Sequence, residues 1–310
     1  MTAALILAAG SIADEQGFNP TEKIGGLSPL RRQIAAFQQV GVERIVIITG
    51  YNAGKVERDC GHSDVIFLHN ENYETGDMLS SVKLGLAYLK DKCRRVFISP
   101  VDVPFFTADT LLAMAAVTAA QVAIPVCGVE IGHPLLLSES AFNTVLDYEG
   151  PNGLKGVMSS NQISRQFVDV SDKGVLFNSR KSSGLDELLA TIPSPKMGAG
   201  VKVWITNEDS CFGPGVFRLM TLVEETGSLK IASSQAGVSY SKAIRVVADV
   251  EKSLGYPIIN SWSGGGKGGG SEITEHGREL MQRYGAFMAD CAQKVHESFE
   301  QHFGDTENLW

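Results

Sequence analysis

Long apolar runs are missing from this sequence of 310 residues, and none approaches the roughly 18 residues that a transmembrane helix requires. The first ten residues, MTAALILAAG, lack the basic leader and the processing site of a signal peptide, and they are typical of a buried strand. We therefore expect no membrane partner and a cytoplasmic protein.

Cysteine is also scarce, because the chain has five scattered cysteines and no CxxC pair: Cys60, Cys93, Cys127, Cys211 and Cys291. This usage indicates free thiols in a reducing compartment and argues against a structural zinc site. Hydrophobic residues make up 44% of the chain and charged residues 20%, as in an ordinary globular protein that is long enough for two domains.

An overall excess of basic residues is missing too, since the net charge is −8 and argues against indiscriminate binding of nucleic acid. The charges are unevenly distributed, however. Acidic residues gather near the C-terminus, whereas basic residues with few acids mark the stretch before it: Lys230, Lys242, Arg245, Lys252 and Lys267. Local charge rather than net charge determines phosphate contact, although an ordinary solvated surface has the same composition.

Strand and helix patterns alternate through residues 1–190. Short apolar, β-branched runs predict buried strands at 3–9, 44–50, 65–69, 95–100 and 122–126. Helical patterns lie between them at 29–40, 78–90 and 107–120. This alternation predicts an α/β fold with a mostly parallel sheet covered by helices on both faces.

Five features in the same region suggest a phosphate or nucleotide site. The first strand ends in small residues and Gly10, which allow backbone N–H groups to approach a phosphate. The others are Lys23 before a glycine pair, the spacing Gly76-xxx-Ser80-Ser81, Asp102 after a buried strand, and Gly132-His133-Pro134. Taken singly, Lys23 fits a surface lysine, Asp102 a turn former before Pro104, and His133 a structural histidine.

Together these motifs resemble the MobA/MocA-like nucleotidyltransferases, which attach a nucleotide to the molybdenum cofactor. The resemblance spans residues 1–190 and implies a Rossmann-like, GT-A-like sheet. It also implies a nucleotide site made of Leu7, Ala8, Ala9, Gly10, Gly76, Ser80 and Ser81. Lys23 and Asp102 would be the catalytic residues, with Lys23 on the phosphates and Asp102 as the ligand of Mg²⁺.

Two departures from the family pattern put its chemistry in doubt. Asp14 and Glu15 follow the first loop where the family has a basic residue, and acids repel a triphosphate. Residues 178–184, NSRKSSG, replace an acidic segment that contributes to the metal site in the family. Arg180 and Lys181 would instead hold an anion directly. We therefore expect poor transfer of a nucleotide.

Residues 214–284 follow a different pattern. An apolar helix ends at Thr226-Gly227, a short helix follows, and the turn Gly237-Val238-Ser239 leads into a longer helix with polar Ser241, Lys242 and Arg245 outward. Short strands at 258–262 and 271–274 then bracket the run GGGKGGG. This order predicts a helix-turn-helix with a wing, and the glycine run alone would also fit a linker.

This segment resembles the winged helix-turn-helix of ModE-type, LysR-like regulators, through Gly227-Ser228, 236–240 and the glycine wing. The resemblance implies that duplex DNA is bound by Ser239, Tyr240, Ser241, Lys242, Arg245 and Lys267. A long helix over 274–303 follows, with apolar residues three and four apart. We expect that stripe to form a homodimer, because palindromic half-sites require a two-fold protein.

The sequence thus predicts three parts: a nucleotidyltransferase-like domain at 1–190, a linker at 191–200, and a DNA-binding winged helix-turn-helix with a dimerisation helix at 201–310. The first hypothesis is a transcriptional regulator of molybdenum metabolism whose first domain senses a nucleotide or molybdopterin-like molecule. The alternative is an active cytidylyl- or guanylyltransferase that uses Mg²⁺ and is fused to a DNA-binding domain. A DNA-tethered module without a ligand ranks below both.

Overall fold

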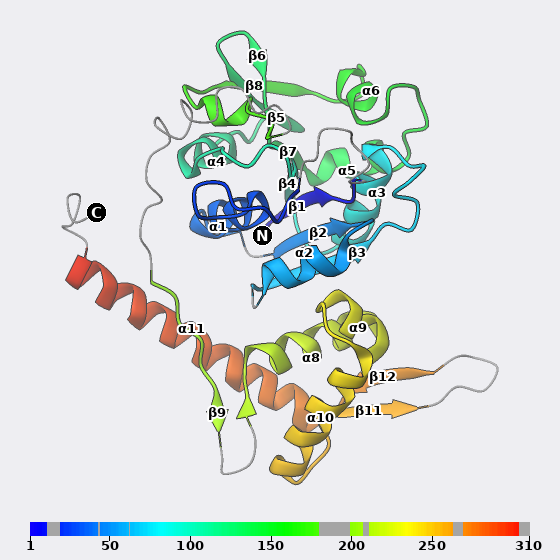
Figure 1. The fold of residues 1–310 in the computed structure, drawn as a ribbon, viewed down its shortest axis with the longest axis vertical. Helices are drawn as coiled ribbons and strands as arrows, with labels where there is room; N and C mark the ends of the chain where they lie inside the picture. Colours follow the sequence, from blue (N-terminus) through cyan, green and yellow to red (C-terminus); the bar gives the residue numbers. More distant parts are fainter. Residues whose placement is uncertain are drawn as a thin grey trace. The chain divides into compact units, whose positions relative to one another are not determined.

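The computed structural model describes residues 1–10, 19–42, 44–61, 63–179, 199–206, 211–262 and 269–303. The chain separates into two compact units, Met1–Ile192 and Pro193–Trp310, which are drawn in Figure 1 and treated separately below. Several sequence-based predictions lie outside the described residues: those for Asp14, Glu15, Arg180, Lys181 and Lys267, and most of the linker at 191–200.

The first unit is built on a mixed, mostly parallel sheet, as the sequence predicts. Its strand order is β3-β2-β1-β4-β7-β5-β6, with β8 paired to β5. Strands β1 to β4 run parallel to one another, whereas β7 is antiparallel to both β4 and β5. The bounds are β1 Thr2–Ala8, β2 Arg44–Thr49, β3 Val65–His69, β4 Arg95–Pro100, β5 Val122–Cys127, β6 Glu130–Ile131, β7 Leu135–Ser138 and β8 Arg165–Asp169.

Helices cover both faces of this sheet (Figure 1). Helices α1, α2 and α4 share one apolar cluster with alternate residues of β1, whereas α3 packs on the other face together with α5 and α6. Their bounds are α1 Pro29–Gln39, α2 Ala53–Cys60, α3 Met78–Leu89, α4 Ala108–Ala115, α5 Glu139–Leu146 and α6 Gly153–Ser159, and a short 3₁₀ helix, η1, spans Lys173–Val175.

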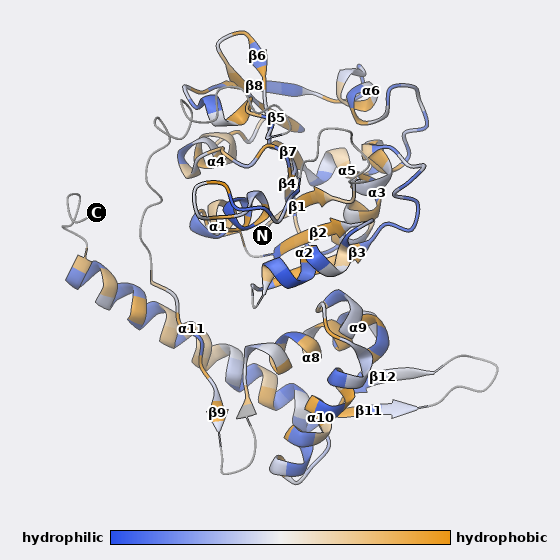
Figure 2. Cartoon of the chain, viewed as in Figure 1, coloured by the Kyte–Doolittle hydropathy of each residue, from blue (hydrophilic) through white to orange (hydrophobic). Residues whose placement is uncertain are grey.

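Close packing fixes α3 on β1. A Cβ added to Gly85 would lie 2.2 Å from Leu5 Cδ1, so the helix sits nearer to the strand than any side chain would allow. Figure 2 shows the central strands as strongly hydrophobic and the outer surface of α2 as hydrophilic. The buried β1 holds its C-terminal end rigidly in the middle of the sheet, where the candidate site begins.

One helix ends earlier than its pattern predicts. The prediction placed it at 107–120, but α4 ends at Ala115. The guanidinium of Arg95 donates hydrogen bonds to the carbonyl oxygens of Ala115 at 2.7 Å and Val117 at 2.8 Å. These bonds satisfy carbonyls at the helix end and allow the chain to turn toward β5.

The second unit contains the helices and the strand pair that the sequence predicts after residue 214. Helices α8, α9 and α10 span Pro214–Thr226, Leu229–Gln235 and Tyr240–Leu254. An antiparallel hairpin of β11, Ile259–Trp262, and β12, Gly270–Ile273, follows α10. A second small hairpin, which the sequence did not predict, precedes α8 and pairs β9, Ile205–Thr206, with β10, Cys211–Phe212.

Helix α11, Glu275–Phe303, closes the second unit. Its first half is anchored by Tyr284, which is 1% exposed, packs against Phe212 and Phe217, and donates a hydrogen bond to Val203 O at 2.7 Å. Figure 1 shows the second half running on beyond the other elements of the unit. Among the described residues, no helix is both long and apolar enough to cross a membrane.

Candidate functional site

A cavity lies at the carboxyl ends of the four parallel strands of the first unit, where ligands bind in open α/β sheets. Residues from several segments line it: Leu7 to Gly10 after β1, Asn52 and Lys55 at the start of α2, Asn70, Tyr73, Gly76 and Ser81 around the β3–α3 connection, and Asp102 after β4. The structure therefore brings together most of the nucleotide-site residues that the sequence resemblance implies.

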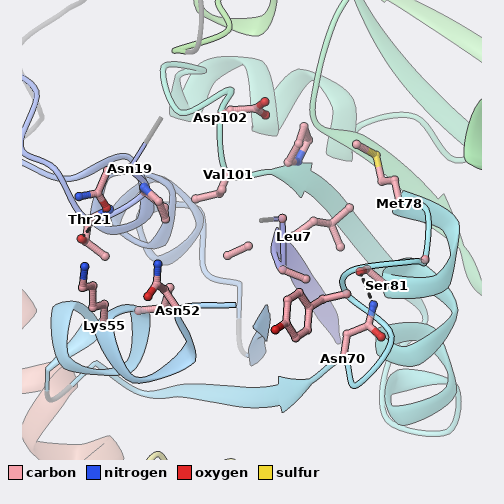
Figure 3. Close-up of a pocket in the computed structure, with 18 of the residues that line it drawn as sticks. Leu7, Asn19, Thr21, Asn52, Lys55, Asn70, Met78, Ser81, Val101 and Asp102 are labelled. Carbon is pink, nitrogen blue, oxygen red and sulfur yellow. Dashed lines mark hydrogen bonds between the residues drawn. The ribbon is translucent and has the colours of Figure 1, made fainter. Parts of the chain in front are cut away.

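Figure 3 shows how these side chains are distributed. Asn19, Thr21, Asn52 and Lys55 form one polar wall, while Asn70, Met78 and Ser81 form the opposite one, with Leu7 on the floor between them. Asp102 projects from a third side, across the end of β1. The cavity thus offers amide, hydroxyl, ammonium and carboxylate groups around an apolar floor.

Two glycines allow the backbone of the cavity to close up. A Cβ on Gly50, at the end of β2, would lie 2.3 Å from Ala9 O and 2.7 Å from Tyr73 Cβ. A Cβ on Gly76 would lie 2.6 Å from Ser80 Oγ and 2.7 Å from Asn72 O. Sequence reasoning found Gly76 but missed Gly50, although a glycine directly after a buried strand is a recognisable signal of close backbone approach.

The start of α3 is organised by Asn70, which is buried and which the sequence prediction also missed. Its Nδ2 donates to Ser81 Oγ at 3.0 Å and to Ser80 Oγ at 3.3 Å, and its Oδ1 accepts from the N–H of Asn72 at 3.0 Å. Asp77 caps the helix by accepting from the N–H of Ser80. Ser81 faces the cavity, whereas Ser80 is mainly part of this cap.

Asp102 stands in the turn that follows β4. Its Oδ2 accepts a hydrogen bond from Asn178 Nδ2 at 3.2 Å, and its carbonyl accepts one from the N–H of Ser179 at 2.6 Å. Burial raises the pKa of the Asp102 carboxyl above its usual range, and the hydrogen bond from Asn178 partly opposes that shift. Asn178 and Ser179 therefore contact Asp102, and the group that Asn178 brings to this carboxylate is an amide rather than a second carboxylate.

Hydrogen bonds from Gln33 hold the backbone of the turn that carries Asp102. This side chain is fully buried in α1, and its Nε2 donates to the carbonyls of Pro100 at 2.7 Å and Val103 at 3.1 Å. These two carbonyls flank Asp102 on either side. Gln33 thus positions the turn without lining the cavity, and only the folded structure reveals the pairing because 67 residues separate Gln33 from Pro100.

Two other predicted residues lie apart from the cavity as described. Lys23 is exposed and is not among the described residues that line the cavity. The lysine in that described lining is Lys55, which lies on the polar wall with Asn52. His133 lies in the β6–β7 connection, where its N–H donates to Val175 O at 2.9 Å. Burial lowers the pKa of the His133 imidazole to about 4, so the ring is neutral at physiological pH.

The protein groups fit a divalent cation only when a ligand supplies further oxygens. Within the described ranges no three His, Cys, Asp or Glu side chains gather as a metal site. Mg²⁺ commonly takes one or two carboxylates and completes its shell with phosphates and water. Asp102 can provide one such ligand to a Mg²⁺ that a nucleotide brings with it.

A separate basic face lies in the second unit on α9 and α10. From Ser228 to Ala248 the sequence contains Lys230, Lys242 and Arg245 and no acidic residue. All three basic side chains are exposed. Ser239 caps α10 by accepting from the N–H of Lys242 at 3.3 Å, so Tyr240, Ser241, Lys242 and Arg245 occupy its first two turns.

The hairpin β11–β12 is tied to both helices of this face. Ser271 accepts at Oγ from the N–H of Leu229 at 3.2 Å and donates its own N–H to Gly227 O at 2.8 Å. Glu251 Oε1 accepts from the N–H groups of Ile258 and Ile259 at 2.8 and 3.0 Å. These bonds set the hairpin at a fixed angle beside the α9–α10 pair.

Comparison with known proteins identifies the first unit. The model of the MobA-like NTP transferase domain family matches residues 4–166, just over half of the chain, and the chain belongs to this family. A nucleotidyl transferase from Methanothermobacter thermautotroptrophicus has a similar fold, with a TM-score of 0.53 at 20% identity over 62% of this chain and 99% of that one. A Mycobacterium sp. strain JC1 homologue of Mycobacterium tuberculosis rv0371c gives 0.51 at 19% identity, over 62% and 96%.

The C-terminal region matches two curated proteins. It is 35% identical over 83 residues to the molybdenum-pterin-binding protein MopB of Rhodobacter capsulatus, and 28% identical over 87 residues to the transcriptional regulator ModE of Yersinia pestis. These matches cover 27% and 28% of this chain. The chain spans about a third of the length of each relative, 30% of MopB and 33% of ModE.

Proposed function

We propose that this member of the MobA-like NTP transferase domain family is a DNA-binding transcriptional regulator of molybdenum metabolism, in which the first unit senses a ligand. The observation that carries the proposal is the basic face of α9 and the first two turns of α10, where residues 228–248 carry no acid, beside a fixed hairpin. In a winged helix-turn-helix the second helix of such a pair lies in the major groove and the first crosses the backbone, while the wing contacts DNA beside them.

Charge supports a nucleic acid partner for this face. Lys230, Lys242 and Arg245 are exposed within residues 228–248, which carry no acid and are followed by Asp249, although the whole chain has a net charge of −8. A strongly acidic protein that keeps one basic face binds phosphate locally and repels it elsewhere. The names of the two curated relatives, a transcriptional regulator and a molybdenum-pterin-binding protein, are in keeping with a regulator that responds to molybdenum.

The chemistry around Asp102 favours sensing over catalysis. The Asn178 amide donates to one oxygen of the Asp102 carboxylate, so that oxygen already has a partner, and the amide adds no second negative charge to hold a metal. Transfer of a nucleotide requires strong stabilisation of the charge that develops at phosphorus, and loss of one contributor typically costs a hundredfold or more. A cavity of this kind binds a nucleotide or a molybdopterin-like molecule more readily than it turns one over.

An active cytidylyl- or guanylyltransferase is the second candidate. The cavity at the ends of β1 and β4, with Gly10 and Asp102 on its rim, favours it. Under that alternative Asp102 would hold Mg²⁺ together with the phosphates of CTP or GTP. The ammonium of Lys55 would neutralise part of the ligand's charge.

A two-part experiment on the full-length protein tests the proposal. Fluorescence anisotropy with duplex DNA across a range of salt concentrations should show affinity that falls steeply with salt, as phosphate contacts require. A thermal-shift series with CTP, GTP, molybdate and molybdopterin derivatives, with and without Mg²⁺, should identify a ligand that raises the melting temperature.

Release of pyrophosphate decides between the two candidates. The proposal expects little or no turnover with any nucleoside triphosphate and molybdopterin. Robust turnover that disappears in Asp102→Ala would establish the transferase instead, and absence of DNA binding at low salt would remove the regulator.

The stripe on α11 supports a homodimer as part of this proposal. Beyond Tyr284 the residues at helical spacing remain apolar and only half-buried in a single chain, namely Met288, Cys291, Val295 and Phe299. A helix with one apolar side gains most from packing on a second helix, and a two-fold dimer would present two copies of the basic face to a palindromic site.

A further inference from the structure

One side of α10, next to its buried face, carries an exposed apolar strip that contact with phosphates alone would not require. Tyr240 and Ile244 are 46% and 45% exposed, and Ala248 one turn further on is exposed as well. These three residues follow one another at a spacing of four, so they lie along one line of the helix. The strip borders the face that Ala243, Val247 and Val250 bury, so it forms one edge of the exposed surface of α10.

A polar strip runs directly beside the apolar one. Ser241 and Arg245 are each one residue further along the chain than Tyr240 and Ile244, and both are exposed. The first two turns of α10 therefore display a hydroxyl and a guanidinium next to a phenol ring and a branched aliphatic side chain. Exposure of Tyr240 and Ile244 does not stabilise the fold, because burial of a large apolar side chain lowers the free energy and exposure raises it.

The edge of a base pair in the major groove matches such a mixed surface. Thymine presents a C5 methyl group there, whereas guanine presents the N7 and O6 acceptors that arginine binds. A protein partner would fit the apolar strip alone, but it would not account for the exposed cations Lys230, Lys242 and Arg245, which are the charged residues of the stretch 228–248 that ends just before Asp249. The combination of apolar strip and cations therefore favours DNA as the occupant of this face.

We infer that Ile244, with Tyr240 beside it, reads a thymine by contact with its C5 methyl group, and that Arg245 reads the neighbouring part of the groove. This inference rests on the proposed DNA-binding function and deepens it, since it assigns base selection to an apolar contact. Neither aliphatic nor methyl group carries a charge, so the contact selects the base without changing the salt dependence of binding.

The size of the effect follows from the surface that the contact buries. Removal of one buried methyl group costs about fourfold in affinity, the equivalent of one CH₂ transferred to water. Replacing thymine with uracil removes this one methyl group from the DNA, whereas Ile244→Ala removes three carbon atoms from the protein and should cost at least as much.

The experiment uses the full-length protein and a duplex selected by it from a random pool. Each thymine of the selected site is replaced in turn by uracil, and affinity is measured for the wild type and for Ile244→Ala. The wild type should lose about fourfold at one thymine in each half-site. Ile244→Ala should bind the thymine duplex at least about fourfold more weakly and lose nothing further when that thymine becomes uracil.

Ile205→Ala is the matched control, because Ile205 is 44% exposed in the same unit but lies in β9, outside the helix pair. It should keep both the wild-type affinity and the wild-type sensitivity to uracil. The half-exposed position of Ile244 keeps the fold intact in Ile244→Ala, which a thermal melt verifies.

The outcomes are distinguishable. If no duplex is bound at low salt, the proposed function fails and this inference fails with it. If DNA is bound but the selected site lacks thymine, or uracil has no effect anywhere, or the two losses simply add, only the inference is overturned. If Ile244→Ala instead changes the sedimentation coefficient, the apolar strip covers a second copy of the chain, and the inference is again overturned.

Discussion

The Asn178 amide beside Asp102 gives the most direct test of why the cavity would bind rather than react. We predict that Asn178→Asp strengthens binding of Mg²⁺ by at least about tenfold at pH 8, because it adds a second carboxylate oxygen near the first. In the native protein 3.2 Å separates Asn178 Nδ2 from Asp102 Oδ2. The substitution exchanges that amide donor for an oxygen of almost the same size.

The magnitude follows from the distance. Two unit charges 3.2 Å apart repel by about 5 kcal/mol at an effective dielectric constant of about 20. This repulsion corresponds to roughly four pKa units, so the metal-free variant keeps a proton on the carboxyl pair near neutral pH. A folded-state pKa above the unfolded value stabilises the fold at low pH, and that contribution is lost as pH rises through the folded-state pKa. Mg²⁺ should displace the proton and restore stability at high pH.

Isothermal titration calorimetry in buffers of different ionisation enthalpy measures both the affinity and the proton released. Asn178→Ala is the first control, because it removes the hydrogen bond and adds no charge. The second is the exchange Asp102→Asn with Asn178→Asp, which keeps a single carboxylate. If Asn178→Ala tightens metal binding as much as Asn178→Asp does, or if Asn178→Asp binds Mg²⁺ no better than the wild type at pH 8, the second-carboxylate argument is wrong.

Three further predictions concern other parts of the molecule. His133→Leu should reduce the loss of stability of the first unit as pH falls from 6.5 to about 4. The neutral His133 imidazole has a folded-state pKa of about 4, so protonation on acidification costs the fold roughly 3 kcal/mol, and leucine cannot be protonated. Thermal melts of both proteins against pH measure this difference, and parallel curves for the two proteins would contradict the prediction. Arg245→Ala should weaken binding to sites with guanine at the contacted position and leave the slope of log affinity against log salt nearly unchanged, as a base contact would; a slope reduced by about 0.9 with equal weakening on all sequences would show a phosphate contact instead. A chain that ends after Gly285 keeps the Tyr284 anchor but lacks the apolar half of α11, and it should sediment as a monomer with weakened binding to a palindromic site; a dimer of normal affinity would move the interface elsewhere.

Local patterns in the sequence were sufficient for most of the fold. The runs before Gly10 and at 65–69 and 95–100 became strands because β-branched and apolar residues fill a buried parallel sheet. The helix that begins at Tyr240 was equally predictable, since Ser239 caps it and Gly255 ends it in a left-handed conformation. In these segments propensity, capping and burial agree.

Other elements depended on contacts that no local pattern contains. Strands β7 and β8 both pair with β5, although β6 and other segments lie between them in the sequence. The sheet therefore does not follow the order of the strands along the chain, and no local pattern predicts that pairing. The early end of α4 is a similar case, because Arg95 belongs to a strand about twenty residues before the carbonyls that it binds. Hydropathy alone extended that helix to residue 120.

The candidate site shows the same division. Asp102 and Gly76 could be found because a carboxylate after a buried strand and a glycine before a helix are local signals. Gln33 and Asn178 could not, because they act on the Asp102 turn across 67 and 76 residues of chain. The resemblance to nucleotidyltransferases marked the segment at 178 as altered, and the structure adds that its amide donates to the remaining carboxylate.

A sensor places a physical demand on this cavity that an enzyme does not. A ligand can change DNA affinity only by the difference between its affinities for the DNA-bound and the free protein, and DNA must then change ligand affinity by the same factor. A site with the same ligand affinity in the DNA-bound and the free protein would have no effect on DNA binding, however tightly it bound the ligand. The Asp102 carboxylate, which is partly buried and accepts a hydrogen bond from Asn178, suits this demand if a shift of the turn or of Asn178 changes how it meets a Mg²⁺-bound or anionic ligand. Measurement of ligand affinity with and without duplex DNA therefore tests regulation through the cavity itself, and equal affinities would leave the first unit without a regulatory role.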